Sequence, residues 1–152
     1  NVARLHAIAS NVEIDYRHTT VETLLEKENS SFDVVCCLEM LEHVPDPASA
    51  IEACSNLVRP GGSIFFSTLN RNLKSFVLAI VGAEYVLSLL PRGTHDYKKF
   101  IRPSELDGWA RSARLSLSSI TGMHYNPITK RYSLGDGVDV NYLCHYSAPD
   151  TL

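Results

Sequence analysis

Several features that would mark a secreted or disulfide-bonded chain are missing from this sequence. It contains four cysteines in 152 residues, none of them in paired C-x-x-C spacing. Three of the four stand among apolar residues, where a reduced thiol packs like a small hydrophobic side chain. The first residues carry neither a start methionine nor the basic and apolar pattern of a signal peptide. We therefore predict a protein of a reducing compartment, and we interpret the beginning of the sequence as the interior of a domain.

Low-complexity tracts and internal repeats are also absent from the sequence. Hydrophobic residues make up 45% of the chain and charged residues 20%, with a formal net charge of -3. This composition is typical of a soluble globular protein. A chain of 152 residues can bury one core, but it is small for a complete cofactor-dependent enzyme. We expect one domain, or a piece of one.

A basic segment extends from residue 59 to residue 103, with seven Lys or Arg residues against two acidic ones. A surface for single-stranded nucleic acid would interleave basic residues with exposed aromatic ones. Here the basic residues flank an aliphatic block instead. We therefore expect no nucleic-acid partner.

Hydrophobic patterning predicts that strands and helices alternate along the first half of the chain. Residues 32–38 are apolar on both faces, which favours a strand buried inside a parallel sheet. Residues 50–58 place apolar side chains at helical spacing, and this helix is expected to stop at the sequence RPGG. A second apolar strand is predicted at residues 63–69. This order is typical of an α/β layer.

The other segments are less regular. Residues 12–16 alternate apolar and acidic side chains, and residues 20–25 fit a short helix. A later helix is predicted at residues 104–113, with a capped start at Ser104. Residues 115–125 and 131–146 favour two strands around turns at NPIT and GDG, which would form a closing antiparallel pair. No second domain boundary is visible.

A cluster of chemically active side chains follows the first predicted strand. Glu39, Glu42 and His43 fall within five positions of the sequence CLEMLEHVPDP. In open parallel sheets, ligands collect beyond the carboxyl ends of the strands, and a helix or a tight turn would bring these three side chains together. Two carboxylates and one imidazole suit magnesium or manganese better than zinc. The sharper hypothesis is therefore a divalent metal site.

Other interpretations of the same residues stay open. Glu39 and Glu42 could stand at a solvated helix start, where acidic residues oppose the helix dipole, with His43 as a cap. A zinc-protease site is weaker, because the inverted motif H-x-x-E-H would need a histidine where Glu39 stands.

Six motifs together carry a family resemblance, which extends from about residue 12 to residue 146. They are CLEMLEHVPDP, LVRPGGSIFFSTLNRN, GAEY, GTHDYKKFIRP, ITGMHYNPIT and GDGVDVNY. With these motifs the chain resembles the ubiquinone-biosynthesis O-methyltransferases, which act on polyprenyl-dihydroxybenzoate or 3-demethylubiquinol. The resemblance implies a partial Rossmann-like, S-adenosylmethionine-dependent methyltransferase fold of the α/β class, with a mostly parallel sheet and a closing antiparallel strand.

The resemblance also implies site residues. It assigns Glu39, Glu42 and His43 to a magnesium site and Leu38 to contact with S-adenosylmethionine. The turn that contains Val21 and Glu22 is a further cofactor contact, although these residues also fit a plain helix start. The family's glycine-rich loop would lie upstream of the first residue. We therefore expect a C-terminal part of one methyltransferase domain that alone binds S-adenosylmethionine poorly and is inactive.

Two mechanisms fit the predicted catalytic residues His43 and Glu42. A phenol has a pKa near 10, so little phenolate exists at neutral pH. A magnesium ion could bind the ring oxygens of the substrate and lower the pKa of its hydroxyl. Alternatively, His43 could act directly as the general base.

The aliphatic block at residues 76–90 is too short to span a bilayer and contains Glu84. It lies in a predicted insertion at about residues 71–102 and fits either core burial or partial entry into lipid. Lys74, Arg92, Lys98 and Lys99 bracket it, and each would contribute about 1 kcal/mol near an anionic membrane. With the lipid-soluble substrate that the resemblance implies, we predict peripheral docking at an anionic membrane surface. The expected location is the cytoplasmic face of a bacterial inner membrane, with the mitochondrial matrix side second.

A ubiquinone-biosynthesis complex is a further expected partner. Two rival functions remain: a non-catalytic lipid-binding module of methyltransferase-like fold, and a metal-dependent hydrolase. Cofactor binding by a chain extended upstream would discriminate against the first, and hydrolysis without a methyl donor would favour the second.

Overall fold

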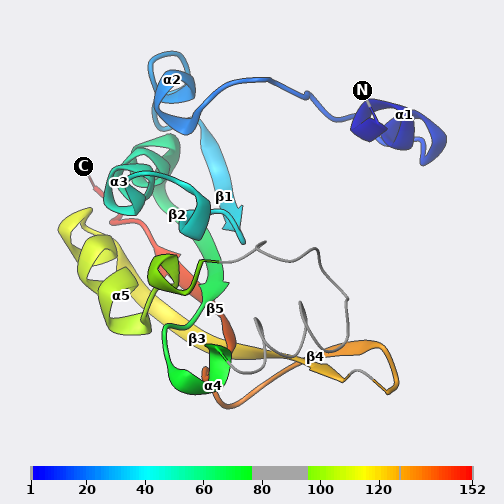
Figure 1. Ribbon diagram of the computed structural model, residues 1–152. Helices are drawn as coiled ribbons and strands as arrows, with labels where there is room; N and C mark the ends of the chain where they lie inside the picture. The colour runs from blue at the N-terminus through cyan, green and yellow to red at the C-terminus, as the bar shows by residue number, and fades with distance from the viewer. Residues whose placement is uncertain (1, 77–95, 127, 152) are drawn as a thin grey trace.

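A mixed five-stranded sheet is the centre of the computed structural model, which describes residues 2–76, 96–126 and 128–151. The strands lie in the order β1-β2-β5-β3-β4 (Figure 1). Their bounds are β1 Phe32–Leu38, β2 Val58–Leu69, β3 Ser116–Asn126, β4 Arg131–Gly135 and β5 Asn141–Ser147. The helices are α1 Val2–Ala9, α2 Val21–Leu25, α3 Pro47–Leu57, α4 Leu73–Ser75 and α5 Pro103–Ser112, with short 3-10 turns η1 Leu41–His43 and η3 Tyr97–Lys99.

The sequence prediction of an α/β fold is confirmed by the unit β1-α3-β2, in which β1 and β2 pair in parallel. The other strand pairs of the described sheet are antiparallel. The predominance of parallel pairing that the resemblance implies is therefore not seen in these strands. β1 also lies at the edge of the described sheet, and its side chains at Val34 and Leu38 are each 51% exposed. The strand was predicted to be buried on both faces, so the structure differs here.

The hydrophobic core lies between the sheet and the helices α3 and α5, which cover the same face side by side (Figure 1). Ile64, Phe66, Tyr142 and Tyr146 point to this face from the adjacent strands β2 and β5 and are fully buried. Alternate residues of a strand share a face, which explains the spacing of these positions. Full burial of each such side chain stabilises the fold by about 1.5–3 kcal/mol.

Helix α3 begins where its sequence supplies a cap. Asp46 Oδ1 accepts hydrogen bonds from the backbone N–H groups of Ala48 at 3.0 Å and Ser49 at 3.1 Å. Pro47 occupies the first helical turn, where its missing N–H costs nothing. Such a cap contributes about 1 kcal/mol. The helix ends at Leu57, immediately before the predicted stop at RPGG.

The C-terminal strands differ from the sequence prediction. Residues 131–146 form two strands, because a turn around Gly137 separates β4 from β5. Gly137 has a φ of +93°, which a residue with a side chain rarely adopts. β5 then lies between β2 and β3. Helix α5 also starts one residue early, at Pro103, since Glu105 accepts a hydrogen bond from the Arg102 N–H at 2.8 Å. The predicted cap at Ser104 is therefore wrong.

Residues 12–16 form no strand, and α1 lies away from the sheet at the end of this extended segment (Figure 1). In the ranges that the structure describes, no helix is long and apolar enough to cross a membrane. Most of the predicted insertion at about residues 71–102, with its aliphatic block, lies outside the described residues. The insertion and the membrane contact of the block therefore remain predictions.

Candidate functional site at the carboxyl edge of the sheet

The parallel strands β1 and β2 end side by side, and the candidate site lies where they end. Leu38, the last residue of β1, pairs with Ser67 of β2. The chain then turns through η1, which contains Glu42 and His43. Because parallel strands present their carboxyl ends at the same edge, the CLEM and STL sequences meet here.

Glu39 is held by hydrogen bonds to both the backbone and the side chain of a single serine, Ser67. Its backbone N–H donates to the Ser67 carbonyl oxygen at 3.0 Å, and its Oε1 accepts a hydrogen bond of 2.7 Å from Ser67 Oγ. Glu39 has a φ of +52°, in the left-handed region that residues other than glycine seldom occupy. The chain therefore leaves β1 in a strained turn that carries a carboxylate.

Glu42 is a buried carboxylate with one oxygen unsatisfied. Its residue is 3% exposed, and Oε2 accepts a hydrogen bond of 2.8 Å from the fully buried hydroxyl of Thr68. Oε1 is buried without a hydrogen-bond partner among the described residues. Buried polar atoms nearly always find a partner, so this oxygen is a candidate for contact with a ligand or a water molecule.

The three predicted metal ligands are not gathered into one group. Ser67 and Thr68 are consecutive residues of β2, and consecutive residues of a strand point to opposite faces. Their hydroxyls therefore anchor Glu39 and Glu42 on opposite sides of the strand, while His43 is exposed. Throughout the described parts of the chain, no three His, Cys, Asp or Glu side chains come together as a metal site would require. As they stand, these residues do not fit a three-ligand magnesium centre.

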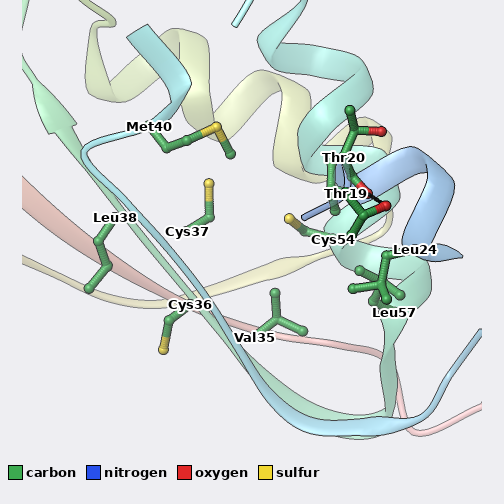
Figure 2. Close-up of a pocket in the computed structure, with 11 residues that line it drawn as sticks. Thr19, Thr20, Leu24, Val35, Cys36, Cys37, Leu38, Met40, Cys54 and Leu57 are labelled. Carbon is green, nitrogen blue, oxygen red and sulfur yellow. Dashed lines mark hydrogen bonds between the residues drawn. The ribbon is translucent and has the colours of Figure 1, made fainter. Parts of the chain in front are cut away.

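A cavity of about 380 Å³ lies between the edge of β1, helix α3 and the turn before α2. Of the three residues predicted to contact the cofactor, Leu38 and Val21 line this cavity and Glu22 does not, and their contact with a cofactor stays a prediction. Figure 2 shows that Cys36 and Leu38 point to one side of β1, and Cys37 to the other. Small-molecule sites range from about 300 to 1,000 Å³, so the volume suits a ligand of nucleoside size.

Two buried thiols also line this cavity, Cys37 from β1 and Cys54 from α3. A hydrogen bond from Cys54 lowers the pKa of the Cys37 thiol, against burial and the charge of Glu42. The same hydrogen bond raises the pKa of Cys54, and burial adds to this effect. The carboxylate of Glu42 thus acts electrostatically on one residue of the cavity wall, although Glu42 itself does not line the cavity.

Sequence reasoning missed the part that β2 plays in the site. Ser67 and Thr68, in the STLNRN sequence, hold the two carboxylates. Asn70 continues this sequence and donates from Nδ2 to the Val138 carbonyl at 2.8 Å, which ties the end of β2 to the β4–β5 connection. The signal was available, since polar hydroxyls at the carboxyl end of an apolar strand are unusual.

Comparisons with known proteins were made for the whole chain. Residues 3–119 match a family model described as a methyltransferase domain. The ubiquinone biosynthesis O-methyltransferase of Hahella chejuensis is 64% identical over 149 residues, which are 98% of this chain and 63% of that protein. The protein of the same name from Azotobacter vinelandii is 63% identical over 93% of this chain and 61% of its own. The chain thus spans about three-fifths of the length of these relatives.

Solved structures are similar in fold at low sequence identity. A SAM-dependent methyltransferase of Thermotoga maritima superimposes with a TM-score of 0.62 at 20% identity, over 95% of this chain and 69% of that chain. The N-methyltransferase NodS of Bradyrhizobium japonicum, in complex with S-adenosyl-L-homocysteine, gives a TM-score of 0.58 at 14% identity, over 97% and 61%.

Proposed function

Because this chain belongs to the methyltransferase domain family, we propose that it serves the S-adenosylmethionine-dependent O-methylation of a polyprenylated phenol in ubiquinone biosynthesis. The proposal is supported by relatives at 63% and 64% identity that are named ubiquinone biosynthesis O-methyltransferases. It is also supported by the position of the orphan carboxylate of Glu42, which is the observation that carries the mechanism.

The cavity beside β1 is the proposed place of S-adenosylmethionine. Its volume of about 380 Å³ and its apolar lining by Val21, Leu38 and Met40 suit a nucleoside and a thioether chain. When bound, the cofactor supplies a methyl group on a positively charged sulfur. Leu38 and Met40 would exclude water from this side, which favours a transfer in which charge is neutralised.

Glu42 is the proposed acceptor of the substrate's hydroxyl proton. Its Oε1 is buried and has no hydrogen-bond partner among the described residues, and Thr68 fixes the other carboxylate oxygen. The phenol proton would pass to Oε1. The phenolate oxygen would then bond to the methyl carbon as the bond between that carbon and the cofactor sulfur breaks, which would leave S-adenosylhomocysteine. A positioned base typically contributes a factor of about 10²–10⁴ to the rate. His43, exposed on η1, remains the alternative base from the sequence prediction.

Magnesium stays a prediction. The described arrangement of Glu39, Glu42 and His43 does not supply three ligands to one ion. We therefore assign no catalytic step to a metal.

We also propose that the protein docks peripherally on the cytoplasmic face of a bacterial inner membrane, where its substrate is dissolved. Lys98 and Lys99 are exposed on η3, and each cation contributes about 1 kcal/mol near anionic lipid. Flotation with liposomes tests this, and a variant with Lys98 and Lys99 reversed in charge should float less with anionic vesicles.

The central experiment is a methyl-transfer assay with the purified full-length protein. The reaction contains S-adenosylmethionine and a catechol that carries an isoprenoid chain, and mass spectrometry follows the product. We expect one hydroxyl to become a methyl ether, with release of S-adenosylhomocysteine. Binding of the methyl donor without methylation of any phenol would exclude the proposed function and favour a non-catalytic role.

A further inference from the structure

The hairpin of β3 and β4 has one apolar face. Met123 pairs with Leu134, and Tyr125 pairs with Tyr132. Since paired residues and alternate residues share a face, these four side chains stand together. The rings of Tyr125 and Tyr132 lie 4.8 Å apart, which makes them one continuous surface. We call these four residues the apolar hairpin face.

The apolar hairpin face is open to solvent. Tyr125 is 37% exposed, Tyr132 70% and Leu134 64%. The opposite face of the hairpin is polar, with His124 paired to Ser133 and Asn126 paired to Arg131. A strand pair with one apolar and one polar face normally packs its apolar face against a core, another molecule or a ligand.

The register of the sheet joins this face to the candidate site. Leu69 of β2 pairs with Asn141 of β5, and Asn141 pairs with Met123 of β3. Met123 therefore lies on the same side of the sheet as Leu69 and Ser67, the residue that holds Glu39. β3 continues past Met123 to Asn126, so the hairpin projects beyond the carboxyl edge where β1 and β2 end (Figure 1).

We propose that the apolar hairpin face binds the isoprenoid chain of the phenolic substrate, an inference that rests on the proposed function. The aromatic head would lie over the carboxyl ends of β1 and β2, between Glu39 and Glu42. The chain would extend from there on the Glu39 side of the sheet, over Met123, Tyr125, Tyr132 and Leu134. Contact with the branched, unsaturated chain would remove exposed apolar surface from water on both partners. The broad tyrosine rings supply this surface at little cost in side-chain entropy.

Continuity with the site favours the substrate chain over other occupants. The face begins at Met123, which is separated from Leu69 at the end of β2 only by Asn141 of β5, and it extends outward from there. A ligand with a polar head and a long apolar tail fits such a surface, because one end needs the carboxylates and the other needs only apolar contact. A bilayer or a second copy of the chain would not need the face to start at the catalytic edge.

Substrates that differ only in their tails test the proposal. The purified full-length protein is assayed in detergent-free buffer with a catechol bearing three isoprene units and with the same catechol bearing a methyl group. The variant Leu134→Asp should raise the KM for the tailed substrate about tenfold and leave the KM for the short one unchanged. Ser133→Asp places the same charge on the opposite face and should leave both KM values unchanged.

The outcomes separate this inference from the proposed function. An equal rise in both KM values, or no rise in either, would overturn the hairpin assignment while methylation continued. If the wild-type protein methylated neither catechol, calorimetry would measure the affinity for the tailed catechol instead. A lower affinity in Leu134→Asp but not in Ser133→Asp would support the hairpin assignment. An unchanged affinity in both variants would overturn it. Loss of vesicle binding in Leu134→Asp with an unchanged KM for the soluble tailed substrate would assign the face to lipid instead and would also overturn the proposal.

Discussion

Thr68 Oγ1 donates a hydrogen bond of 2.8 Å to Glu42 Oε2, and this bond joins the loop after β1 to the end of β2 inside the protein. Thr68 is fully buried and Glu42 nearly so. The bond fixes one oxygen of the carboxylate and leaves the other without a partner among the described residues. In the proposed mechanism Thr68 is therefore a positioning residue, because it would affect the substrate only through the Glu42 carboxylate.

Replacement of Thr68 by valine should lower kcat, because Glu42 then loses the hydrogen bond that orients it. A hydrogen bond to a charged group is worth about 1.5–3 kcal/mol, which corresponds to a factor of about 10–100 in rate. Thr68→Ser retains the hydroxyl and should stay within about threefold of the wild-type kcat. Steady-state kinetics of both variants, with S-adenosylhomocysteine affinity as a control for folding, make the comparison. Equal losses in the two variants would show that only packing matters at this position.

Replacement of Glu42 by glutamine should separate stability from activity. Glutamine can still accept the Thr68 hydrogen bond but carries no buried charge, so the free energy of unfolding should stay equal or rise by about 1 kcal/mol. Methyl transfer should fall by about 10² or more, because the amide cannot take a proton. Urea denaturation and initial rates measure the two quantities. Glu52→Gln, on the exposed side of α3, is the matched control and should change neither. Retained activity in Glu42→Gln would move the role of base to His43.

Magnesium binding by the protein alone should be weak. Glu39 and Glu42 are held by hydroxyls on opposite sides of β2, and Mg²⁺ keeps its water shell unless several oxygen ligands are already in place. We expect a dissociation constant of about 1 mM or weaker in a calorimetric titration without substrate. Tight binding that is abolished in each of the single variants Glu39→Gln, Glu42→Gln and His43→Ala would show that these three side chains converge after all.

The cysteines should differ strongly in reactivity. All four are free thiols, but only Cys36 is exposed. Burial raises the pKa of Cys144 to about 12, so at pH 8 almost none of it is the reactive thiolate. Iodoacetamide at pH 8 should therefore label Cys36 first, and Cys144 only after unfolding. Because Cys36 lines the cavity, S-adenosylhomocysteine should slow its labelling. Mass spectrometry of peptides reads out each site, and an unchanged rate with saturating ligand would place the cofactor elsewhere.

Alkaline pH should destabilise the fold through two core tyrosines. Burial raises the pKa of Tyr142 and of Tyr146 well above the ordinary value near 10. Below pH 10 both states keep these protons, and above it the unfolded state releases them first, so the free energy of unfolding falls as pH rises. Tyr142→Phe should cost about 1 kcal/mol at pH 7, because the Ile101 carbonyl loses its donor, yet should flatten the fall above pH 10. Denaturation at pH 7 to 11 tests this, and a slope unchanged from wild type would rule out Tyr142 as a source.

Local patterns in the sequence predicted the elements that local patterns control. The apolar run at residues 32–38, the helical spacing that led to α3 and the apolar run that became β2 all appear in the structure. A turn at GDG was predicted, but its division of residues 131–146 into the two strands β4 and β5 was not, because that division depends on the backbone of Gly137 rather than on hydrophobic spacing. The edge position of β1 was also missed, since an apolar run does not specify which neighbours it has.

The site shows the same limit. Sequence placed Glu39 and Glu42 correctly at the carboxyl edge, because a strand end can be located from patterning. Whether the two carboxylates converge depends on Ser67 and Thr68, which lie far along the chain and point in opposite directions from β2. The spacing of Glu39 and Glu42 within one loop does not show whether their carboxylates converge. The family resemblance, and not spacing, named Val21, Glu22 and Leu38 as cofactor contacts; Val21 and Leu38 line one cavity, and the contact itself stays a prediction.

The left-handed backbone of Glu39 shows that the turn after β1 does not have the most stable residue at this position. A glycine there would relieve conformational strain of about 1 kcal/mol or more, and most turns that leave a strand in this way use one. A search for the most thermostable version of the chain would therefore replace Glu39 early. That substitution would remove a carboxylate from the edge where the substrate is expected to react. Glu39 should therefore be kept when the protein is engineered for stability, although its backbone is strained.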